Sequence, residues 1–189
     1  PIRGEFAAVV SLDLRRLDAL HWLDKVSGEA ELGAGVSGPD AERLLGEQGF
    51  SLGHFPQSFR FATIGGFAAT RSSGQDSAGY GRFDEMIRAM RVVTPAGVID
   101  VGGPPASAAG PDLRELFAGS EGTFGVITRV RLRVHPIPEC VRYEAWSFPD
   151  FATGADAFRA VIQTATGPTV LRLSDEVEAG VSLATAHSI

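Results

Sequence analysis

The stretch MIRAMRVVTPAGVIDVG, residues 86–102, predicts a β-hairpin. Two apolar runs flank Thr94-Pro95-Ala96-Gly97, where proline suits the second position of a type I turn and glycine the fourth. Further along, GVITRVRLRV at 125–134 alternates. We expect Val126, Thr128, Val130, Leu132 and Val134 to point inward, and Arg129, Arg131 and Arg133 to form a solvated face. One wet face is typical of an antiparallel sheet.

The rest of the chain places helices between strands. We expect a hairpin within 17–35 and further strands at 6–14, 142–148 and 169–173. Helices are expected within 38–49, 65–70, 110–120 and 151–164, with Leu113, Leu116 and Phe117 on one face of the third. This order predicts an α+β fold with a mostly antiparallel sheet flanked by helices.

The composition is that of an ordinary globular protein. With 189 residues, a net charge of -6 and one cysteine, Cys140, the chain has no disulfide framework and no general attraction to nucleic acid. No apolar run approaches the roughly 20 residues of a membrane span, so we expect no transmembrane segment and a cytoplasmic location. The first apolar run begins almost at Pro1, and from this we expect the chain to be part of a longer polypeptide.

The motif GAGVSG, Gly33 to Gly38, has the G-x-G-x-x-G spacing of a dinucleotide-binding turn. Three features argue against that function. The preceding EAEL carries two carboxylates, Pro39 removes an N–H where a pyrophosphate needs donors, and 55–63 has no acidic residue to bind a ribose. We therefore expect a tight turn that leads into a capped helix.

The glycine-rich stretch from His54 to Gly81 is a stronger ligand-binding candidate. The backbone N–H groups of Gly65 and Gly66 are expected to form an anion nest, and hydroxyl donors stand nearby at Ser58, Thr63, Ser72 and Ser73. Gly74, Gly79 and Gly81 would let a flat ring approach the chain. The alternative is a flexible surface loop, which is disfavoured by four large apolar residues: Phe59, Phe61, Ile64 and Phe67.

Other candidate residues carry weaker signals. In GSEGTFGVIT, residues 119–128, the backbone of a turn could contact a ligand, although a helix-to-strand turn needs glycine in any case. For His54 the alternative to catalysis is a structural polar contact. For Arg172, which lies among apolar residues and could meet an anionic substrate group, the alternative is an ordinary salt bridge. Neither metal-ligand spacing nor a G-x-S-x-G elbow is present, so no metal site is expected.

Four stretches in this order resemble the FAD-binding domain of the vanillyl-alcohol oxidase and p-cresol methylhydroxylase superfamily. They are GHFPQSFRFATIGGFAATRSSGQDSAGYG, VVTPAGVID, GPDLRELFAGSEGTFGVIT and PTVLRLSD. Within that superfamily they are most similar to the alkyldihydroxyacetonephosphate synthases, and next to the D-lactate and glycolate dehydrogenases. The resemblance implies the second FAD subdomain at 1–140 and the start of a substrate-binding cap domain at 141–189. The P-x-G-G-G-T-S loop of the first subdomain does not occur in the sequence.

The resemblance also implies individual roles. His54 and Arg172 match positions important for activity. The implied FAD-binding residues are Gln57, Ser58, Phe59, Arg60, Phe61, Ala62, Thr63, Gly65, Gly66, Thr70, Arg71, Ser72, Ser73, Gly74, Tyr80, Gly81, Glu121, Gly122, Thr123, Phe124, Gly125, Val126 and Ile127. Two positions depart from the synthase pattern. Gln57 stands where the synthases have an acidic residue, and GQDSAG, Gly74 to Gly79, is less basic than the synthase equivalent, which leaves the substrate open.

Three functions follow as expectations. The first is an FAD-dependent enzyme resembling the synthase, which exchanges an acyl for an alkyl group without net redox change. The second is a D-2-hydroxyacid dehydrogenase of the D-lactate or glycolate type. The third is a truncated domain without catalysis, which folds without the cofactor. Enzyme activity is expected of the longer parent protein, and this chain alone is expected to be inactive. The expected partner is a small anionic substrate, a hydroxy acid or a phosphate ester, and a homodimer is possible.

Overall fold

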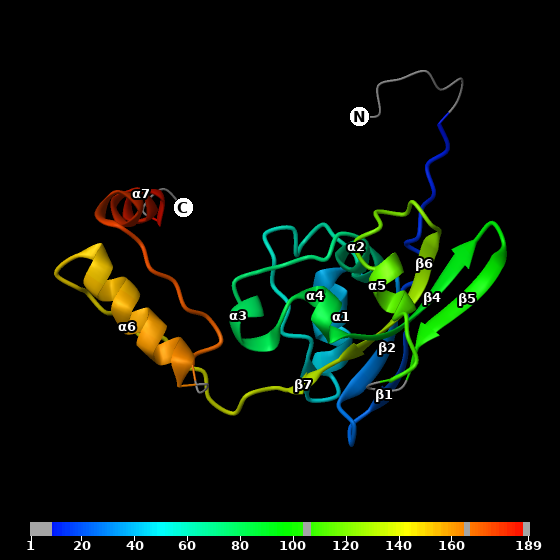
Figure 1. Ribbon diagram of the computed structural model, residues 1–189, viewed down its shortest axis with the longest axis horizontal. Helices are drawn as coiled ribbons and strands as arrows, with labels where there is room; N and C mark the ends of the chain where they lie inside the picture. Colours follow the sequence, from blue (N-terminus) through cyan, green and yellow to red (C-terminus); the bar gives the residue numbers. More distant parts are fainter. Residues whose placement is uncertain (1–8, 104–106, 165–166, 187–189) are drawn as a thin grey trace.

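The computed structural model describes residues 9–103, 107–164 and 167–186. Its main feature is a five-stranded antiparallel sheet in the order β1-β2-β6-β4-β5 (Figure 1). The strands are β1 (Leu20–Asp24), β2 (Glu29–Gly33), β4 (Ile87–Thr94), β5 (Gly97–Gly102) and β6 (Val126–Arg133). Both hairpins are confirmed, because β1 pairs with β2 and β4 pairs with β5. The expected α+β class is confirmed as well.

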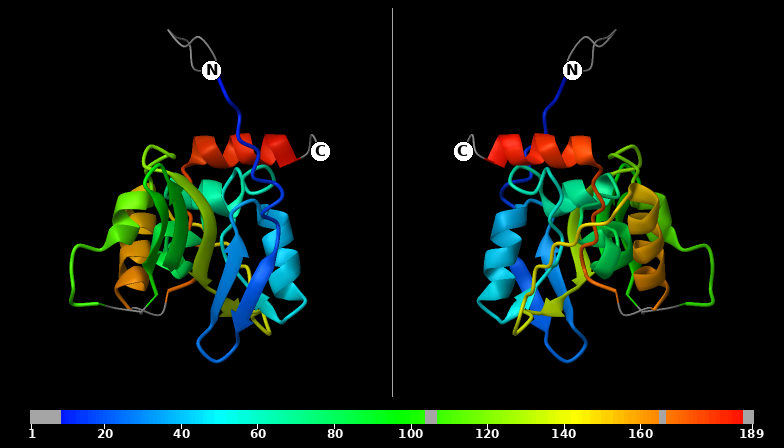
Figure 2. Two further views of the ribbon diagram at one scale, coloured as in Figure 1. Left: turned by 90° about the vertical axis from the view of Figure 1, so that its right-hand side faces the viewer. Right: turned by 90° about the vertical axis from the view of Figure 1, so that its left-hand side faces the viewer.

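Short helices connect these strands. They are α1 (Gly38–Gly46), α2 (Ile64–Ala69), α3 (Ser77–Tyr80), α4 (Phe83–Met86) and α5 (Leu113–Phe117). A second, two-stranded sheet pairs β3 (Phe50–Ser51) with β7 (His135–Pro136). Two longer helices follow, α6 (Phe151–Gln163) and α7 (Glu176–Ala186). Both lie to one side of the five-stranded sheet, and α7 runs crosswise to α6 (Figures 1 and 2).

One face of the five-stranded sheet forms the core. Alternation along β2 buries Ala30 and Leu32, and the same face of β6 buries Val130 and Leu132. Helices α1, α2 and α4 supply the other half of this core, and their fully buried side chains are Leu45, Ile64, Phe67, Phe83 and Met86. Burial of such side chains contributes roughly 1.5–3 kcal/mol each. The core therefore fixes α2, and with it the glycine-rich stretch, against the sheet.

The opposite face of the sheet carries paired charges. Glu31 on β2 lies 3.4 Å from Arg129 and 4.0 Å from Arg131 on β6. The Arg131 guanidinium stacks over the Trp22 ring at 4.8 Å, a cation–π contact. The arginines of β6 are half-buried, so the solvated face predicted from the alternation is more accurately a layer of ion pairs.

The first residues of β6 depart from the predicted alternation. Ile127 is buried, whereas Val126 and Thr128 are only half-buried. The register with β4 shifts here, because Arg91 pairs with Arg129 while Val92 pairs with Ile127. Thr128 is the extra residue of this bulge, and its hydroxyl donates to the Arg91 carbonyl at 3.2 Å. A bulge of this kind reverses which residues face the core.

The start and end predicted for helix α1 are confirmed. The Ser37 hydroxyl caps it by accepting from the Asp40 N–H at 3.2 Å, Pro39 lies in the first turn, and Gly49 beyond the end has a φ of +82°. Helix α5 also forms, but only Phe117 is buried. Leu113 and Leu116 are 45% and 47% exposed, so the apolar face expected for this helix is not covered.

Three predicted strands are absent from the described residues. Residues 9–14, 142–148 and 169–173 form no strand, and the start of the first prediction, 6–8, lies outside the described residues. Each of these segments contains several apolar residues, but a strand also requires a partner to bond its backbone groups. Helix α6 is confirmed, with Phe158 half-buried and Ile162 exposed, and α7 was not predicted. In the part of the chain that the structure describes, no helix has the length and apolarity to cross a membrane.

Candidate functional site

The GAGVSG turn is a structural turn, as predicted. The N–H groups of Gly33 and Gly35 donate to the carbonyls of Ala19 and Leu17 at 2.8 and 2.9 Å, so they are not available to a phosphate. A Cβ at Gly35 would collide with the Leu14 carbonyl. These glycines allow the close approach of the segment that precedes β1, and the turn then enters the capped helix α1.

The two glycine-rich stretches meet at the end of α2. The N–H of Gly119 donates to the carbonyl of Ala68 at 2.9 Å, and the N–H of Glu121 donates to the carbonyl of Ala69 at 3.0 Å. Figure 1 shows α2, α5 and the start of β6 at the same end of the sheet. Backbone hydrogen bonds thus join two segments that lie about fifty residues apart in the chain. The sequence of each segment predicts a ligand site.

Arg71 occupies a backbone position that usually holds glycine. Helix α2 ends in a Schellman motif, because the Ser72 N–H donates to the Phe67 carbonyl at 3.0 Å and the Arg71 N–H to the Ala68 carbonyl at 3.4 Å. Arg71 is therefore the C′ residue, with a left-handed φ of +48°. Among the described residues other than glycine, only Arg71 and Glu121 have positive φ, and both lie at this junction.

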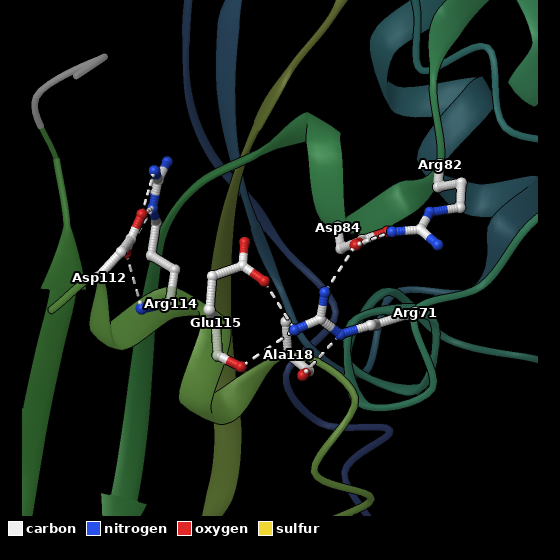
Figure 3. Close-up of polar contacts among 7 residues, drawn as sticks. All are labelled: Arg71, Arg82, Asp84, Asp112, Arg114, Glu115 and Ala118. Atoms are coloured by element: carbon white, nitrogen blue, oxygen red, sulfur yellow. Dashed lines mark hydrogen bonds and ion pairs between the residues drawn. The ribbon is translucent and has the colours of Figure 1, made fainter.

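The Arg71 side chain binds three separate elements (Figure 3). Nε donates to the Ala118 carbonyl at 3.1 Å, and Nη1 donates to Asp84 Oδ2 at 2.9 Å. Nη2 donates to the Glu115 carbonyl at 3.0 Å and lies 2.7 Å from Glu115 Oε2. Glu115 first, and Asp84 after it, raise the pKa of Arg71 above its usual value. All three guanidinium nitrogens are therefore engaged within the chain.

Asp84 is the buried anion of this group. Its side chain is 3% exposed and also accepts from Arg82 Nη2 at 2.7 Å, so one carboxylate oxygen holds two guanidinium groups. Its other oxygen, Oδ1, has no hydrogen-bond partner in the described structure. We refer to Arg71, Asp84, Glu115 and the Ala118 carbonyl as the Arg71 clamp.

His54 is buried beside the same helix end. Its Nε2 lies 3.0 Å from Ser72 Oγ, and its ring makes edge contacts with Phe67 and Phe83 at centroid distances of 5.0 and 5.1 Å. Nδ1 is buried without a partner among the described residues. Burial lowers the pKa of His54 from 6.5 to about 4, so the ring is neutral at pH 7.

Glu42 fixes the loop that leads to His54. Its carboxylate accepts from Ser51 Oγ at 2.8 Å, from the Leu52 N–H at 3.0 Å and from the Gly53 N–H at 3.2 Å. Burial raises the pKa of Glu42, and the three donors oppose that rise. A residue of α1 thus holds the backbone that places the His54 ring.

The expected anion nest at Gly65 and Gly66 is not formed. The Gly65 N–H donates to the Ala34 carbonyl at 2.8 Å, and the Gly66 N–H donates to Thr63 Oγ1 at 3.2 Å. Both N–H groups lie in the first turn of α2, where the cap residue Thr63 and the neighbouring strand segment satisfy them. A Cβ at Gly65 would lie 2.7 Å from the Ala34 Cβ, so this glycine is needed for packing.

The glycines expected to admit a flat ring instead lie against the chain itself. A Cβ at Gly74 would lie 2.9 Å from the Phe55 carbonyl, and one at Gly79 would lie 2.6 Å from Thr169 Cα. At Gly81 the neighbour is the Glu85 carboxylate, at 2.8 Å. Packing within the chain therefore explains why glycine stands at these three positions, and their role toward a flat ring stays a prediction.

Tyr80, another of the predicted cofactor residues, is half-buried. Its ring lies 4.6 Å from the His135 ring, centroid to centroid, and it fills the space beside Gly53. Its role toward a cofactor stays a prediction.

Many of the remaining predicted cofactor residues are exposed. Phe61 is 89% exposed and Phe124 is 48% exposed, although apolar rings of this size are usually buried. The other exposed members of the predicted set are Gln57, Ser58, Arg60, Thr70, Ser73, Glu121, Gly122 and Thr123. Outward-facing rings, hydroxyls and turn backbone fit one wall of a site for FAD, which has both an apolar ring system and polar groups.

Arg172 lies in the segment between α6 and α7. It is exposed, and its Nη2 donates to Glu178 Oε1 at 2.5 Å, the ordinary salt bridge that the sequence left open. Arg172 lowers the pKa of Glu178. Within the described residues no hydrogen bond joins Arg172 to His54, so their shared role in catalysis stays a prediction.

A shallow cavity of about 240 Å³ lies elsewhere, on the charged face of the sheet. Arg91, which lines it, donates to both oxygens of Asp100 at 2.7 and 2.9 Å. Because its other arginines are also paired or stacked, this cavity offers little unpaired charge. Among the described residues, no group of three or more histidine, cysteine or acidic side chains is placed to hold a metal.

Sequence reasoning missed the partners of Arg71. Asp84, Glu115 and the Ala118 carbonyl come from other elements, and neither periodicity nor composition links them to position 71. One signal was present. Arg71 is an isolated arginine in a glycine-rich stretch, directly after a short helix, where glycine is the usual residue.

Comparison with known families defines the class of protein. A family model described as FAD binding domain matches residues 3–102, which are 100 of the 189 residues, and a second, FAD linked oxidases, C-terminal domain, matches 137–188. The chain belongs to this family of FAD-linked oxidases.

Individual members of the family share considerable sequence identity with this chain. The alkyldihydroxyacetonephosphate synthase of Trypanosoma brucei brucei is 41% identical over 94% of this chain and 29% of its own length. A mitochondrial D-lactate dehydrogenase of Arabidopsis thaliana is 34% identical over 87% and 29%. A solved alkyldihydroxyacetonephosphate synthase structure gives a TM-score of 0.80 at 38% identity, over 90% of this chain and 31% of that one. The chain thus spans about a third of the length of these relatives.

Proposed function

We propose that this chain forms one wall of the FAD site of a flavoprotein that resembles alkyldihydroxyacetonephosphate synthase. The observation that carries the proposal is the backbone junction of the two glycine-rich segments, where Gly119 and Glu121 donate to the end of α2. The domain assignment, with the second FAD subdomain at 1–140 and the cap from 141, belongs to the same proposal. Membership in the family and 41% identity to a synthase support it.

FAD, when bound, supplies the electron chemistry that no protein side chain provides. The residues of this chain would bind and orient it. Phe61 and Phe124 would cover apolar parts of the cofactor, and Ser58 and Thr70 would donate hydroxyl hydrogen bonds. The neutral His54 ring would support this wall through Ser72, since it has no positive charge to offer at pH 7.

The substrate class follows from the relatives and is proposed here as a small anionic molecule. A phosphate ester is favoured because the synthases are 37–41% identical to this chain. The second candidate function, oxidation of a D-2-hydroxy acid, is favoured by the 34% identity to the Arabidopsis D-lactate dehydrogenase. Arg172 would meet the anionic group after exchanging its Glu178 partner. A cytoplasmic location and a homodimer remain part of the proposal.

The first experiment measures FAD uptake. The full-length protein that contains this chain is incubated with FAD, desalted, and examined for flavin absorbance near 450 nm and for quenched flavin fluorescence. Retained, quenched flavin is the expected result. Colourless protein whose fluorescence titration shows no binding would instead support the third alternative, a truncated domain that folds without the cofactor.

The second experiment separates the two activities. The FAD-loaded protein is assayed for exchange of an acyl chain for an alkyl chain on dihydroxyacetone phosphate, and in parallel for reduction of a dye by D-lactate or glycolate. Exchange without dye reduction is expected. Dye reduction that requires the D-2-hydroxy acid would instead support the second candidate function, that of a D-2-hydroxyacid dehydrogenase.

A further inference from the structure

The position of Arg71 separates the role of its backbone from that of its side chain. As the C′ residue of α2 it has a φ of +48°, a conformation that glycine adopts without steric cost and arginine adopts rarely. A glycine would therefore serve the helix end better. The side chain must therefore account for an arginine at this position.

That side chain reaches across the junction. Nε donates to the carbonyl of Ala118, the residue that follows α5, and Nη2 donates to the carbonyl of Glu115 within α5. Nη1 binds Asp84, whose burial fixes the position of the guanidinium (Figure 3). A planar guanidinium spreads its donors over three nitrogens in a fixed fork and so reaches acceptors on three sides, whereas an ammonium directs all of its donors from one nitrogen.

The clamped acceptors lie directly before the loop that the resemblance assigns to FAD. Ala118 is followed by Gly119, where an added Cβ would lie 2.8 Å from Arg71 Nε. The half-buried Ser120 and the exposed residues 121–124 come next. The amides of Gly119 and Glu121 extend the attachment to α2 by two backbone bonds. The clamp thus fixes where this loop leaves α5 and how it faces the segment 70–73.

We infer that Arg71 is a positioning residue for the FAD site: its side chain holds the loop 119–125 in place against α2 and does not itself contact the cofactor. The inference rests on the proposed function and corrects the direct cofactor contact that the resemblance implied for this residue. It requires that the loop be ordered before FAD arrives, because every member of the clamp belongs to the protein.

The test uses Arg71→Gly in the full-length protein, because glycine keeps the left-handed backbone and removes only the side chain. Two quantities are measured: the Kd for FAD by flavin fluorescence, and the amide hydrogen exchange of Gly119 and Glu121 in the cofactor-free protein. We expect the Kd to rise about tenfold or more and exchange to accelerate at Gly119 and Glu121, while the amides of β4 and β5 keep their protection.

Three further variants sharpen the test. Arg71→Lys keeps the charge without the fork, so an intermediate Kd is expected. Glu115→Ala removes an acceptor outside the predicted FAD residues and should weaken binding in the same direction, by less. Arg43→Ala is the matched control, because Arg43 makes two ion pairs on α1, with Asp40 and Glu47, and should leave both the Kd and the exchange unchanged.

Each contrary result has a definite meaning. A higher Kd with unchanged exchange at Gly119 and Glu121 would show that Arg71 contacts FAD directly, and would overturn the inference. Faster exchange throughout the sheet would show a general stabilising role, and would overturn it as well. If the wild-type protein fails to bind FAD, the proposed function fails, while the exchange measurement still decides whether the clamp orders the loop.

Discussion

His54 Nε2 lies 3.0 Å from Ser72 Oγ, and this bond joins the loop after β3 to the residue that closes α2. His54 is 1% exposed, and the rings of Phe67 and Phe83 enclose it. In the neutral imidazole only an uncharged Nδ1 lacks a partner, whereas protonation would bury a positive charge and leave a charged N–H without an acceptor among the described residues. Because burial keeps His54 neutral in the folded chain, the free energy of unfolding depends on pH.

The first prediction is a loss of stability in mild acid. The pKa of His54 is about 4 in the folded chain and 6.5 in the unfolded chain, so between these values the unfolded chain binds more protons. The full contribution is present above pH 6.5 and is lost as pH falls toward 4, on the order of 3 kcal/mol. Denaturant unfolding of wild type and His54→Gln from pH 7 to pH 4.5 measures it. The wild type should lose more; parallel curves for the two proteins would refute the linkage.

The second prediction concerns the buried carboxylate of Asp84. Asp84→Ala removes the anion that Arg71 and Arg82 share. Because both guanidinium groups keep partial access to solvent, the expected cost is that of the lost charged hydrogen bonds, about 2 kcal/mol or roughly 6 °C in Tm. Calorimetry of the cofactor-free protein measures the change. Asp156→Ala, which breaks the exposed Arg159 pair, is the control and should hardly alter Tm. Equal shifts in both variants would contradict the assignment of Asp84 as a buried anchor.

The local parts of this fold were predictable from sequence because their signals are local. The turn residues Thr94 to Gly97 predict the β4–β5 hairpin, and Ser37 with Pro39 marks the start of α1. The predictions of strands at 142–148 and 169–173 were wrong because a run of apolar residues cannot supply the neighbouring strand that completes the backbone hydrogen bonds. Helix α7 was missed because its segment lacks a strong apolar stripe.

The sequence indicated the two candidate segments but not the contacts between them. The excess of glycine singled out 62–81 and 119–128 as ligand-binding candidates, and the structure joins the two segments, yet Gly65, Gly74 and Gly79 lie against the chain's own neighbours. Such close approaches depend on tertiary packing, which no spacing rule encodes. The Arg71 clamp was hidden for the same reason, since its acceptors lie up to 47 residues away.

The third prediction tests the GAGVSG turn by comparing two Gly→Ala changes. At Gly35 the new Cβ would meet the Leu14 carbonyl, a backbone atom that cannot move aside alone, so Gly35→Ala should destabilise the protein by roughly 2–4 kcal/mol. At Gly46 a Cβ meets nothing within 4 Å, and alanine favours the helix, so Gly46→Ala should stabilise by roughly 0.5–1 kcal/mol. Urea unfolding measures both, and the same sign for both changes would contradict the packing role.

The last prediction concerns Phe61, whose ring is 89% exposed and adds little to the core of this chain. If the proposed FAD site is right, Phe61→Ser should raise the Kd for FAD roughly tenfold, because a ring buried only by the cofactor loses its apolar contact. The Tm of the cofactor-free protein should stay within about 1 °C, since the exposed ring packs on little. Val98→Ser, at an exposed position of the edge strand β5, is the matched control and should change neither quantity. An unaltered Kd in Phe61→Ser would remove the segment 57–63 from the wall of the site, while a lower Tm would show that its ring packs against the protein.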